Sequence, residues 1–270
     1  MENVDDKVNY QVLLEKDFNK KIDLIKDKTN ILHFSTGADS VASFLKLREN
    51  GIEPILIYKY FIPHLKMVDN YIDYFQNKFN VRIYQLSHRM WGEMIGNLQF
   101  QKPMVEKKGN KLFNNYYIQL AHAFGKDLSA FDMFLDNIFG KNAIYHYGLR
   151  YTDGINRFRH LRKAGVMFNN KFYPIASFKI SDIQAILKKH NCKLPIEYGL
   201  WGISFESPRA WNIGLIKEHC KETYKQILGH FPLIDYEMYR EKYNKLNRHF
   251  TTRLSQYSQF AISKEEYAEW

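Results

Sequence analysis

The sequence predicts an α/β fold with a doubly wound parallel sheet. Apolar runs at 31–34, 54–60 and 81–86 have the near-continuous hydrophobicity of strands that are covered on both faces. Segments with apolar residues at helical spacing separate these runs, and strands that alternate with helices favour parallel pairing through right-handed crossovers. In such a sheet, ligands bind beyond the carboxyl ends of the strands, so polar residues at those ends are the candidate site.

The composition is that of a globular protein, because 45% of the residues are hydrophobic and 16% are aromatic. No apolar run reaches the ~20 residues that a membrane-spanning helix needs. The N-terminal segment is acidic and lacks the apolar core of a signal peptide, so we expect a cytoplasmic protein that is not attached to a membrane. Cys192 and Cys220 are too few for a disulfide scaffold or a four-thiolate metal site.

The formal net charge is +10, which suits polyanionic partners such as nucleotides, RNA or DNA. The excess charge is spread along the chain, so composition alone does not identify a dedicated nucleic-acid module. Nucleic acid is therefore kept open as a partner.

A short loop of small and polar residues follows the first strand. Residues 35–40 read Ser-Thr-Gly-Ala-Asp-Ser, and a helical pattern with Val41, Phe44 and Leu45 on one face begins at once. The first turn of a helix leaves backbone N–H groups unpaired and carries partial positive charge, which suits an anion. We interpret the segment as a phosphate-binding loop. Its candidate binding residues are Ser35, Thr36, Gly37, Asp39 and Ser40.

The alternative is that Ser35, Asp39 and Ser40 are turn and cap residues only. The loop is not a Walker loop, because no Gly-Lys-Ser/Thr follows Gly37. It is not a dinucleotide fingerprint either, because the second and third glycines are missing.

Four arginines lie within thirteen residues beyond the next expected strand, 143–149. Arginine binds phosphate and sulfate oxygens in bidentate fashion. The alternative is a helix whose Ile155, Phe158 and Leu161 face inward while its basic residues face water. That alternative does not account for Arg150 at the strand end. The candidate binding residues of this segment are Gly148, Arg150 and Arg157.

The remaining pattern predicts mostly helix. Ser181 and Gln184 form a capping-box pattern at the start of one helix, whose buried face is Ile183, Ile186 and Leu187. The polar, basic segment 101–111 is interpreted as a surface loop, or as a flap over a nucleotide. Other expected helices cover 5–27, the segment from the loop to Asn50 with Gly51 as its stop, 65–79, 116–140, and about 208–250 with a break at Pro232.

We expect three parts along the chain. These are an N-terminal flanking helix at 1–29, a nucleotide-binding core at 30–205 and a helical C-terminal extension at 206–270.

Taken in order, these segments resemble the PP-loop superfamily, in particular its phosphoadenylyl-sulfate reductase-like branch. The loop 35–40 is similar to the Ser-Gly-Gly-X-Asp-Ser loop that binds the pyrophosphate of ATP, and 58–63 is similar to the family's second-strand exit with its Phe-Pro turn. The other segments that carry the resemblance are Gly148-Leu-Arg150 with Asp153 and Arg157, Tyr173-Pro-Ile with the helix that follows, and Tyr198-Gly199.

The resemblance implies an adenine nucleotide alpha-hydrolase-like fold that binds ATP or a related nucleotide with Mg²⁺. It implies that Asp39 helps to place Mg²⁺ and that the adenine lies near Tyr58. The residues that would hold the phosphates are Ser35, Gly37, Asp39 and Ser40.

The chain also departs from the family. Thr36 stands where Gly is usual, Ala38 stands where Lys is common, and the acidic residue usual at the end of the second strand is replaced around Lys59. The nucleophilic cysteine of the sulfonucleotide reductases is missing from 264–270, and paired cysteines are missing from 201–208. A redox-active reductase, or a thiolation enzyme that uses a persulfide, is therefore not expected.

The expected function is that of an ATP pyrophosphatase or adenylyltransferase acting on an unknown acceptor. Asp39 and Arg150 are the candidate catalytic residues, and Arg157 would help Arg150 to hold the acceptor or the α-phosphate. Two alternatives stay open: a non-catalytic nucleotide sensor, and a basic nucleic-acid-binding protein on the same scaffold. A homo-oligomer and a complex with a partner subunit are both compatible with the sequence.

Overall fold

The computed structural model describes residues 4–96, 99–100, 128–243 and 254–269. The chain divides into two compact units. The first unit contains Met1–Tyr58, Arg82–Tyr84 and Asp136–Leu194, and the second contains Lys59–Val81, Gln85–Leu135 and Pro195–Trp270. The division at 1–29, 30–205 and 206–270 stays a prediction.

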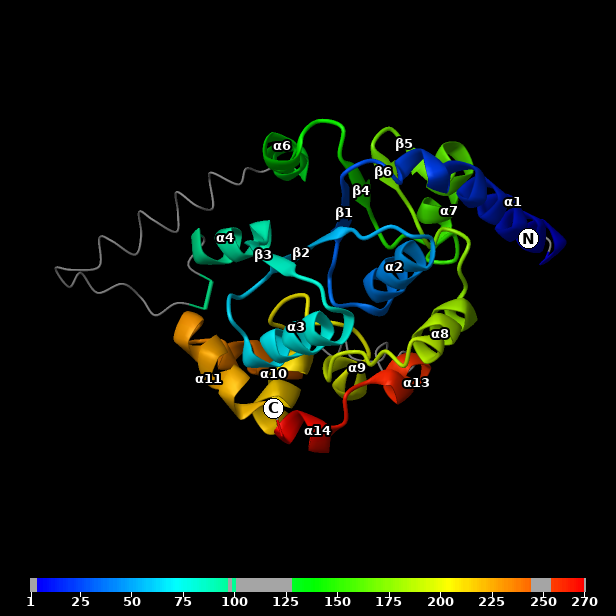
Figure 1. The fold of residues 1–270 in the computed structure, drawn as a ribbon. Helices are drawn as coiled ribbons and strands as arrows, with labels where there is room; N and C mark the ends of the chain where they lie inside the picture. Colours follow the sequence, from blue (N-terminus) through cyan, green and yellow to red (C-terminus); the bar gives the residue numbers. More distant parts are fainter. Residues whose placement is uncertain (1–3, 97–98, 101–127, 244–253, 270) are drawn as a thin grey trace. The chain divides into compact units, whose positions relative to one another are not determined.

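A six-stranded, mostly parallel sheet has the order β3-β2-β1-β4-β6-β5 (Figure 1). β1 pairs in parallel with β2 and with β4, and β4 pairs in parallel with β6. The α/β class and the parallel core of the sheet are thus confirmed, and the order is compatible with a Rossmann-like doubly wound fold. The strands are β1 (Asn30–His33), β2 (Ile55–Tyr60), β3 (Ile83–Ser87), β4 (Ile144–His146), β5 (Met167–Phe168) and β6 (Lys171–Phe172).

The edge of the sheet differs from the fully parallel expectation, because β5 runs antiparallel to β6. The two strands have two residues each and are joined at Asn169 and Asn170, with Asn169 at a φ of 53°. Strands this short show no alternating pattern, so this hairpin could not be predicted from local periodicity.

The strand order places a topological switch point beside β1. The chain runs from β1 to β2 and β3 on one side and then continues at β4 on the other side of β1. In register, Ile31 lies opposite Tyr145 and Leu32 opposite His146. The carboxyl ends of β1 and β4 therefore meet, which is where open α/β sheets bind ligands.

The first unit also contains four α-helices among its described residues. Phe18, Leu47, Leu161 and Phe172 belong to one buried cluster, which joins α1, α2 and α7 to the sheet. The expected helix over 5–27 is confirmed as α1 with a final 3₁₀ turn, and Gly51 ends the next helix with a φ of 76°. The bounds are α1 (Val4–Lys21), the 3₁₀ turn η1 (Ile22–Ile25), α2 (Ala38–Glu49), α7 (Ile155–Ala164) and α8 (Ile180–Lys189).

One local prediction in this unit was wrong, as was one detail of the alternative interpretation of 150–163. Ile155 is 53% exposed rather than inward-facing, because roughly 120° of helix rotation separates it from the buried Leu161. α8 begins one residue before Ser181, so its N-cap is Lys179, and the carboxylate of Asp182 accepts the Lys179 amide hydrogen at 2.7 Å. Gln184 therefore does not complete the cap. The buried face of α8 is as predicted.

The second unit is helical in its described residues. α3 confirms the helix expected over 65–79. The expected break at Pro232 separates α11 from α12, and Cys220 adds a second break between α10 and α11. The predictions for 101–111 and 116–127 lie outside the described residues. The helices are α3 (Lys66–Phe79), α4 (Arg89–Gly96), α9 (Glu197–Leu200), α10 (Ala210–His219), α11 (Lys221–His230), α12 (Asp235–Tyr243), α13 (Leu254–Tyr257), the 3₁₀ turn η2 (Ser258–Phe260) and α14 (Lys264–Ala268).

α6 (Leu128–Phe139) confirms the C-terminal part of the helix expected over 116–140. Within the described ranges, every helix is too short or too polar to cross a bilayer.

Candidate functional site

The loop between β1 and α2 is held closed by its own hydroxyl groups. The Ser40 hydroxyl accepts a hydrogen bond from the Ser35 amide at 3.2 Å and donates one to the Gly37 carbonyl at 2.8 Å. The Ser35 hydroxyl donates a hydrogen bond to the Ser40 hydroxyl oxygen at 3.3 Å. Ser40 therefore fixes the shape of the loop from a buried position, and Ser35 is the exposed hydroxyl.

Thr36 has a left-handed backbone conformation, with a φ of 61°. A β-branched residue is rarely found there, because its Cβ approaches the following carbonyl oxygen, at a cost of roughly 1–2 kcal/mol. The Thr36 hydroxyl donates to the Ser35 carbonyl at 2.6 Å. The loop thus holds strain at the one position where glycine would relieve it.

α2 begins directly after Gly37, which has no side chain to cap the helix. The φ of Gly37 is −75°, so its value to the loop is the missing side chain rather than a special conformation. Thr36, Gly37 and Ala38 are buried, whereas Ser35 is exposed and the Asp39 side chain is 35% exposed. The loop is therefore open to solvent at Ser35 and Asp39.

Gly148, which follows β4, lies directly against the first turn of α2. A Cβ on Gly148 would be 3.0 Å from the main-chain carbon, the oxygen and the Cβ of Asp39, which is tighter than nine in ten real Cβ contacts. The close packing of these two segments accordingly depends on glycine at position 148. This contact brings together the two predicted parts of the site, the loop 35–40 and the segment after β4.

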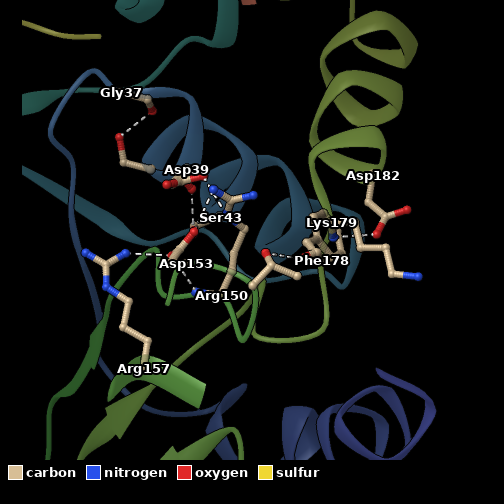
Figure 2. Close-up of polar contacts among 11 residues, drawn as sticks. Gly37, Asp39, Ser43, Arg150, Asp153, Arg157, Phe178, Lys179 and Asp182 are labelled. Atoms are coloured by element: carbon tan, nitrogen blue, oxygen red, sulfur yellow. Dashed lines mark hydrogen bonds and ion pairs between the residues drawn. The ribbon is translucent and has the colours of Figure 1, made fainter. Parts of the chain in front are cut away.

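A chain of four charged side chains extends from this contact (Figure 2). The Nε of Arg150 lies 3.1 Å from Oδ1 of Asp39, and its Nη2 lies 2.7 Å from Oδ1 of Asp153. Arg157 continues the chain, because its Nη1 lies 2.6 Å from Oδ2 of Asp153. The Arg150 amide also donates to Oδ2 of Asp153, at 3.1 Å. The order is therefore Asp39, Arg150, Asp153, Arg157.

Among these four charged side chains, Arg150 is the buried cation, with 9% of its surface exposed. Its Nη1 has no hydrogen-bond partner among the residues that the structure describes, and its Nε approaches Asp39 without hydrogen-bond geometry. A buried guanidinium donor that is left unsatisfied is costly and rare. An anion bound beside Asp39 would satisfy it.

Asp153 was absent from the predicted site residues, although it is the carboxylate that joins both arginines. Its spacings, three residues from Arg150 and four from Arg157, are those of neighbours in a helical turn, so the sequence contained the necessary sign. His33, at the end of β1, was also missed. Its ring stacks on Tyr147 with centroids 4.5 Å apart, beside the β4 exit.

Tyr58 does not present an open ring face for adenine, because it is buried in β2. Thus the structure brings Gly148 and Arg150 to Asp39 of the loop and joins Arg157 to Arg150 through Asp153, while an adenine contact near Tyr58 stays a prediction.

A buried histidine ties β1 to β4 behind the site. His146 is fully buried, and burial lowers its pKa to about 3, so the ring is neutral. Its Nε2 lies 2.8 Å from Oδ1 of Asn30. The Asn30 amide nitrogen donates to the carbonyls of Ile25 and Lys28, so Oδ1 is the acceptor and His146 carries its proton on Nε2.

A single carboxylate can hold Mg²⁺ here, with the other positions taken by phosphate oxygens and water. Asp39 is the accessible one, since the Asp153 side chain is only 8% exposed. Within the described part of the chain, no cluster of three or more His, Cys, Asp or Glu side chains could hold a metal ion. Asp39 is thus the accessible carboxylate that could hold Mg²⁺ together with phosphate oxygens and water.

Fold and site together define an α/β protein with a mostly parallel sheet and a charged cluster at its switch point. No family model matches this chain, and no curated protein matches it. Membership of the PP-loop superfamily stays a prediction.

Proposed function

We propose that this chain binds the phosphates of ATP, or of a related adenine nucleotide, at the loop Ser35–Ser40, and that it releases pyrophosphate with transfer of the adenylyl group to an acceptor. The observation that carries the proposal is Arg150. Its buried guanidinium lies 3.1 Å from Asp39 in the first turn of α2 and has a free donor in Nη1 among the described contacts.

The location supports an anion site for two reasons. The loop follows β1, at the switch point of the sheet, and leads into the N-terminus of α2, whose dipole favours negative charge. Arg150 adds a full positive charge in a buried setting, where an interaction with phosphate is stronger than in water. No cysteine is present in this cluster, so the chemistry is positioning and charge stabilisation.

Ligand binding must compete with the existing ion pairs. Asp39 and Asp153 neutralise Arg150 and Arg157, so the four side chains together carry no net charge. The Nη1 donor of Arg150 has no hydrogen-bond partner among the described residues, but the atom is buried, so the surrounding side chains must shift before a phosphate oxygen can reach it. Mg²⁺ brought with the nucleotide would neutralise phosphate charge beside Asp39. The exposed Ser35 hydroxyl would donate to a phosphate oxygen in exchange for its 3.3 Å hydrogen bond to Ser40.

The second candidate is a nucleotide-binding protein without turnover. The ion pair between Asp39 and Arg150 favours it, because a carboxylate committed to arginine is less able to act on a ligand. The strained Thr36 favours it as well, since its side chain adds bulk to the loop.

Isothermal calorimetry with ATP and Mg²⁺, together with an assay for released pyrophosphate, separates the two candidates. The proposal expects binding and release for the natural sequence, and a loss of release on the order of 10²-fold for Asp39→Ala. Asp23→Ala is the matched control, because Asp23 is an exposed carboxylate of the same unit outside the site.

Binding without release would establish the non-catalytic candidate. Absence of nucleotide binding, or release that is unchanged in Asp39→Ala, would overturn the proposal.

A further inference from the structure

The outer surface of α7 carries a strip of cations that the nucleotide site does not use. Arg159, Arg162 and Lys163 are all exposed. At roughly 100° per residue, Arg159 lies between the other two on the helix surface, and side chains three or four apart are roughly 5–6 Å from one another. The three charges therefore form one continuous patch, here called the α7 strip.

These cations are not neutralised by the described residues around them. None of the three forms an ion pair within the described part of the chain, in contrast to Arg157, which is bound to Asp153. The carboxylate that contacts the C-terminal end of α7 is Asp17, and it is already engaged by Lys21 and by the amide of Val166. The α7 strip is thus left with an excess positive charge.

An exposed aromatic ring borders the strip. Phe168 in β5 is 46% exposed, and its ring lies 6.3 Å from that of His160, centroid to centroid, at an interplanar angle of 78°. His160 is three residues before Lys163 and is itself held by a hydrogen bond to the Tyr173 hydroxyl at 2.8 Å. An aromatic surface at the edge of a row of cations is the arrangement with which proteins bind single-stranded nucleic acid, because the cations follow the phosphates and the ring stacks on a base.

We infer that the α7 strip and Phe168 form a binding surface for single-stranded nucleic acid. Charge complementarity supports this occupant, since the whole chain has a net charge of +10 and the strip concentrates three unpaired cations on two helical turns. The exposed ring favours a single strand over a duplex, because the bases of a duplex are already stacked on one another. The inference does not depend on nucleotide binding at the loop, because none of these residues belongs to that site.

The test is fluorescence anisotropy with a labelled single-stranded oligothymidylate of about 20 nucleotides, titrated with the full chain at several salt concentrations. The test variant replaces all three cations by glutamine, which retains helix propensity at exposed positions. The matched control removes three exposed lysines of the same unit, through Lys16→Gln, Lys20→Gln and Lys28→Gln. Circular dichroism and urea unfolding confirm that both variants are folded.

We expect the natural sequence to bind the oligonucleotide with an affinity that falls with salt. Loss of three phosphate contacts should reduce the slope of log K against log salt by about 2 and weaken binding at least tenfold at low salt. Phe168→Ala should weaken binding about fivefold or more without changing the slope. The lysine control should retain most of the affinity.

Four results would overturn the inference: no binding of the oligonucleotide, equal losses in the α7 variant and the lysine control, tighter binding of a duplex than of a single strand, or binding only to anionic vesicles. Calorimetry with ATP on the α7 variant, in which glutamine replaces Arg159, Arg162 and Lys163, tests whether the two sites are independent. If that variant loses oligonucleotide but binds ATP as the natural sequence does, the surface is independent of the loop.

Discussion

The main chain of Asp39 lies so close to Gly148 that a methyl group at position 148 would be 3.0 Å from its carbonyl carbon and oxygen. The two residues are more than a hundred positions apart in sequence, and each follows a neighbouring parallel strand. This contact determines how closely the segment after β4 packs against α2, and therefore where Arg150 lies.

Gly148→Ala is expected to destabilise the protein by about 1–3 kcal/mol, because the obstructing atoms belong to main chain that cannot turn away. It should also weaken the proposed binding of ATP, since the first turn of α2 must shift. Urea unfolding and calorimetry measure the two effects. Gly229→Ala in α11 is the control, because nothing lies within 4 Å of its added Cβ. A Gly148→Ala protein with natural stability would contradict the close contact.

Thr36→Gly is expected to be more stable than Thr36→Ala, by about 1 kcal/mol. Both variants lose the hydroxyl and the γ-methyl group, but only alanine keeps a Cβ at a φ of 61°. In ordinary backbone the order is reversed, because glycine costs about 0.5–1 kcal/mol relative to alanine. Urea unfolding of the two variants decides the sign, and a more stable alanine variant would refute the strained conformation.

Arg150→Gln is expected to cost about 3–5 kcal/mol, because it leaves the largely buried carboxylate of Asp153 with one partner fewer and uncovers the charge of Asp39. Arg157→Gln, which removes the other cation beside Asp153, should cost under about 1 kcal/mol, since the Arg157 side chain is half exposed. The pair forms its own control. Equal losses in urea unfolding would show that burial of Arg150 does not matter.

His146 should make stability depend on pH. Burial lowers its pKa in the folded protein to about 3, below the usual value of 6.5, so the folded state binds fewer protons than the unfolded state between these values. The stabilising effect is complete above pH 6.5 and is lost as the pH falls toward 3. His146→Gln keeps an N–H donor for Asn30 but does not titrate.

When the pH is lowered from 7 to 5, the free energy of unfolding of His146→Gln should therefore rise by about 2 kcal/mol relative to that of the natural sequence. His160→Gln, at an exposed histidine, is the control substitution. A constant difference between His146→Gln and the natural protein would show that His146 is accessible to protons.

Glu197, in the second unit, has the opposite effect. Burial raises the pKa of its carboxyl group to about 7, against the weaker lowering influence of the Glu197 and Phe205 amides. The folded state holds the proton more tightly, so the stabilising effect is present below pH 4.5 and is lost as the pH rises toward 7. When the pH is raised from 5 to 8, the free energy of unfolding of Glu197→Gln, measured in urea, should therefore rise by about 2–3 kcal/mol relative to that of the natural sequence. Parallel profiles would mean that the carboxyl group is hydrated. Glu218→Gln, at an exposed side chain, is the control.

The parts of the fold that follow local physical rules could be predicted from the sequence. The apolar runs that became β1 and β2, and the stop at Gly51, are short-range patterns of hydrophobicity and backbone freedom. The hairpin of β5 and β6 could not be predicted, because two-residue strands have no period.

The candidate site shows the same limit. Arg150 was identified from its place after a strand, but its pairing with Asp39 depends on strand order, which no local pattern encodes. Burial of Tyr58, and of Glu197 without a charged partner in the described chain, likewise follows from tertiary packing rather than from residue type.

The central place of β1 in the sheet has a consequence for biosynthesis. β2 directly follows the loop and α2, but β4, the other neighbour of β1, begins only at Ile144. While the ribosome makes the intervening residues, one side of β1 has unpaired main-chain groups of the kind that promote aggregation. A nascent chain halted before Ile144 should therefore bind chaperones, and release from them should follow once the fourth strand has emerged.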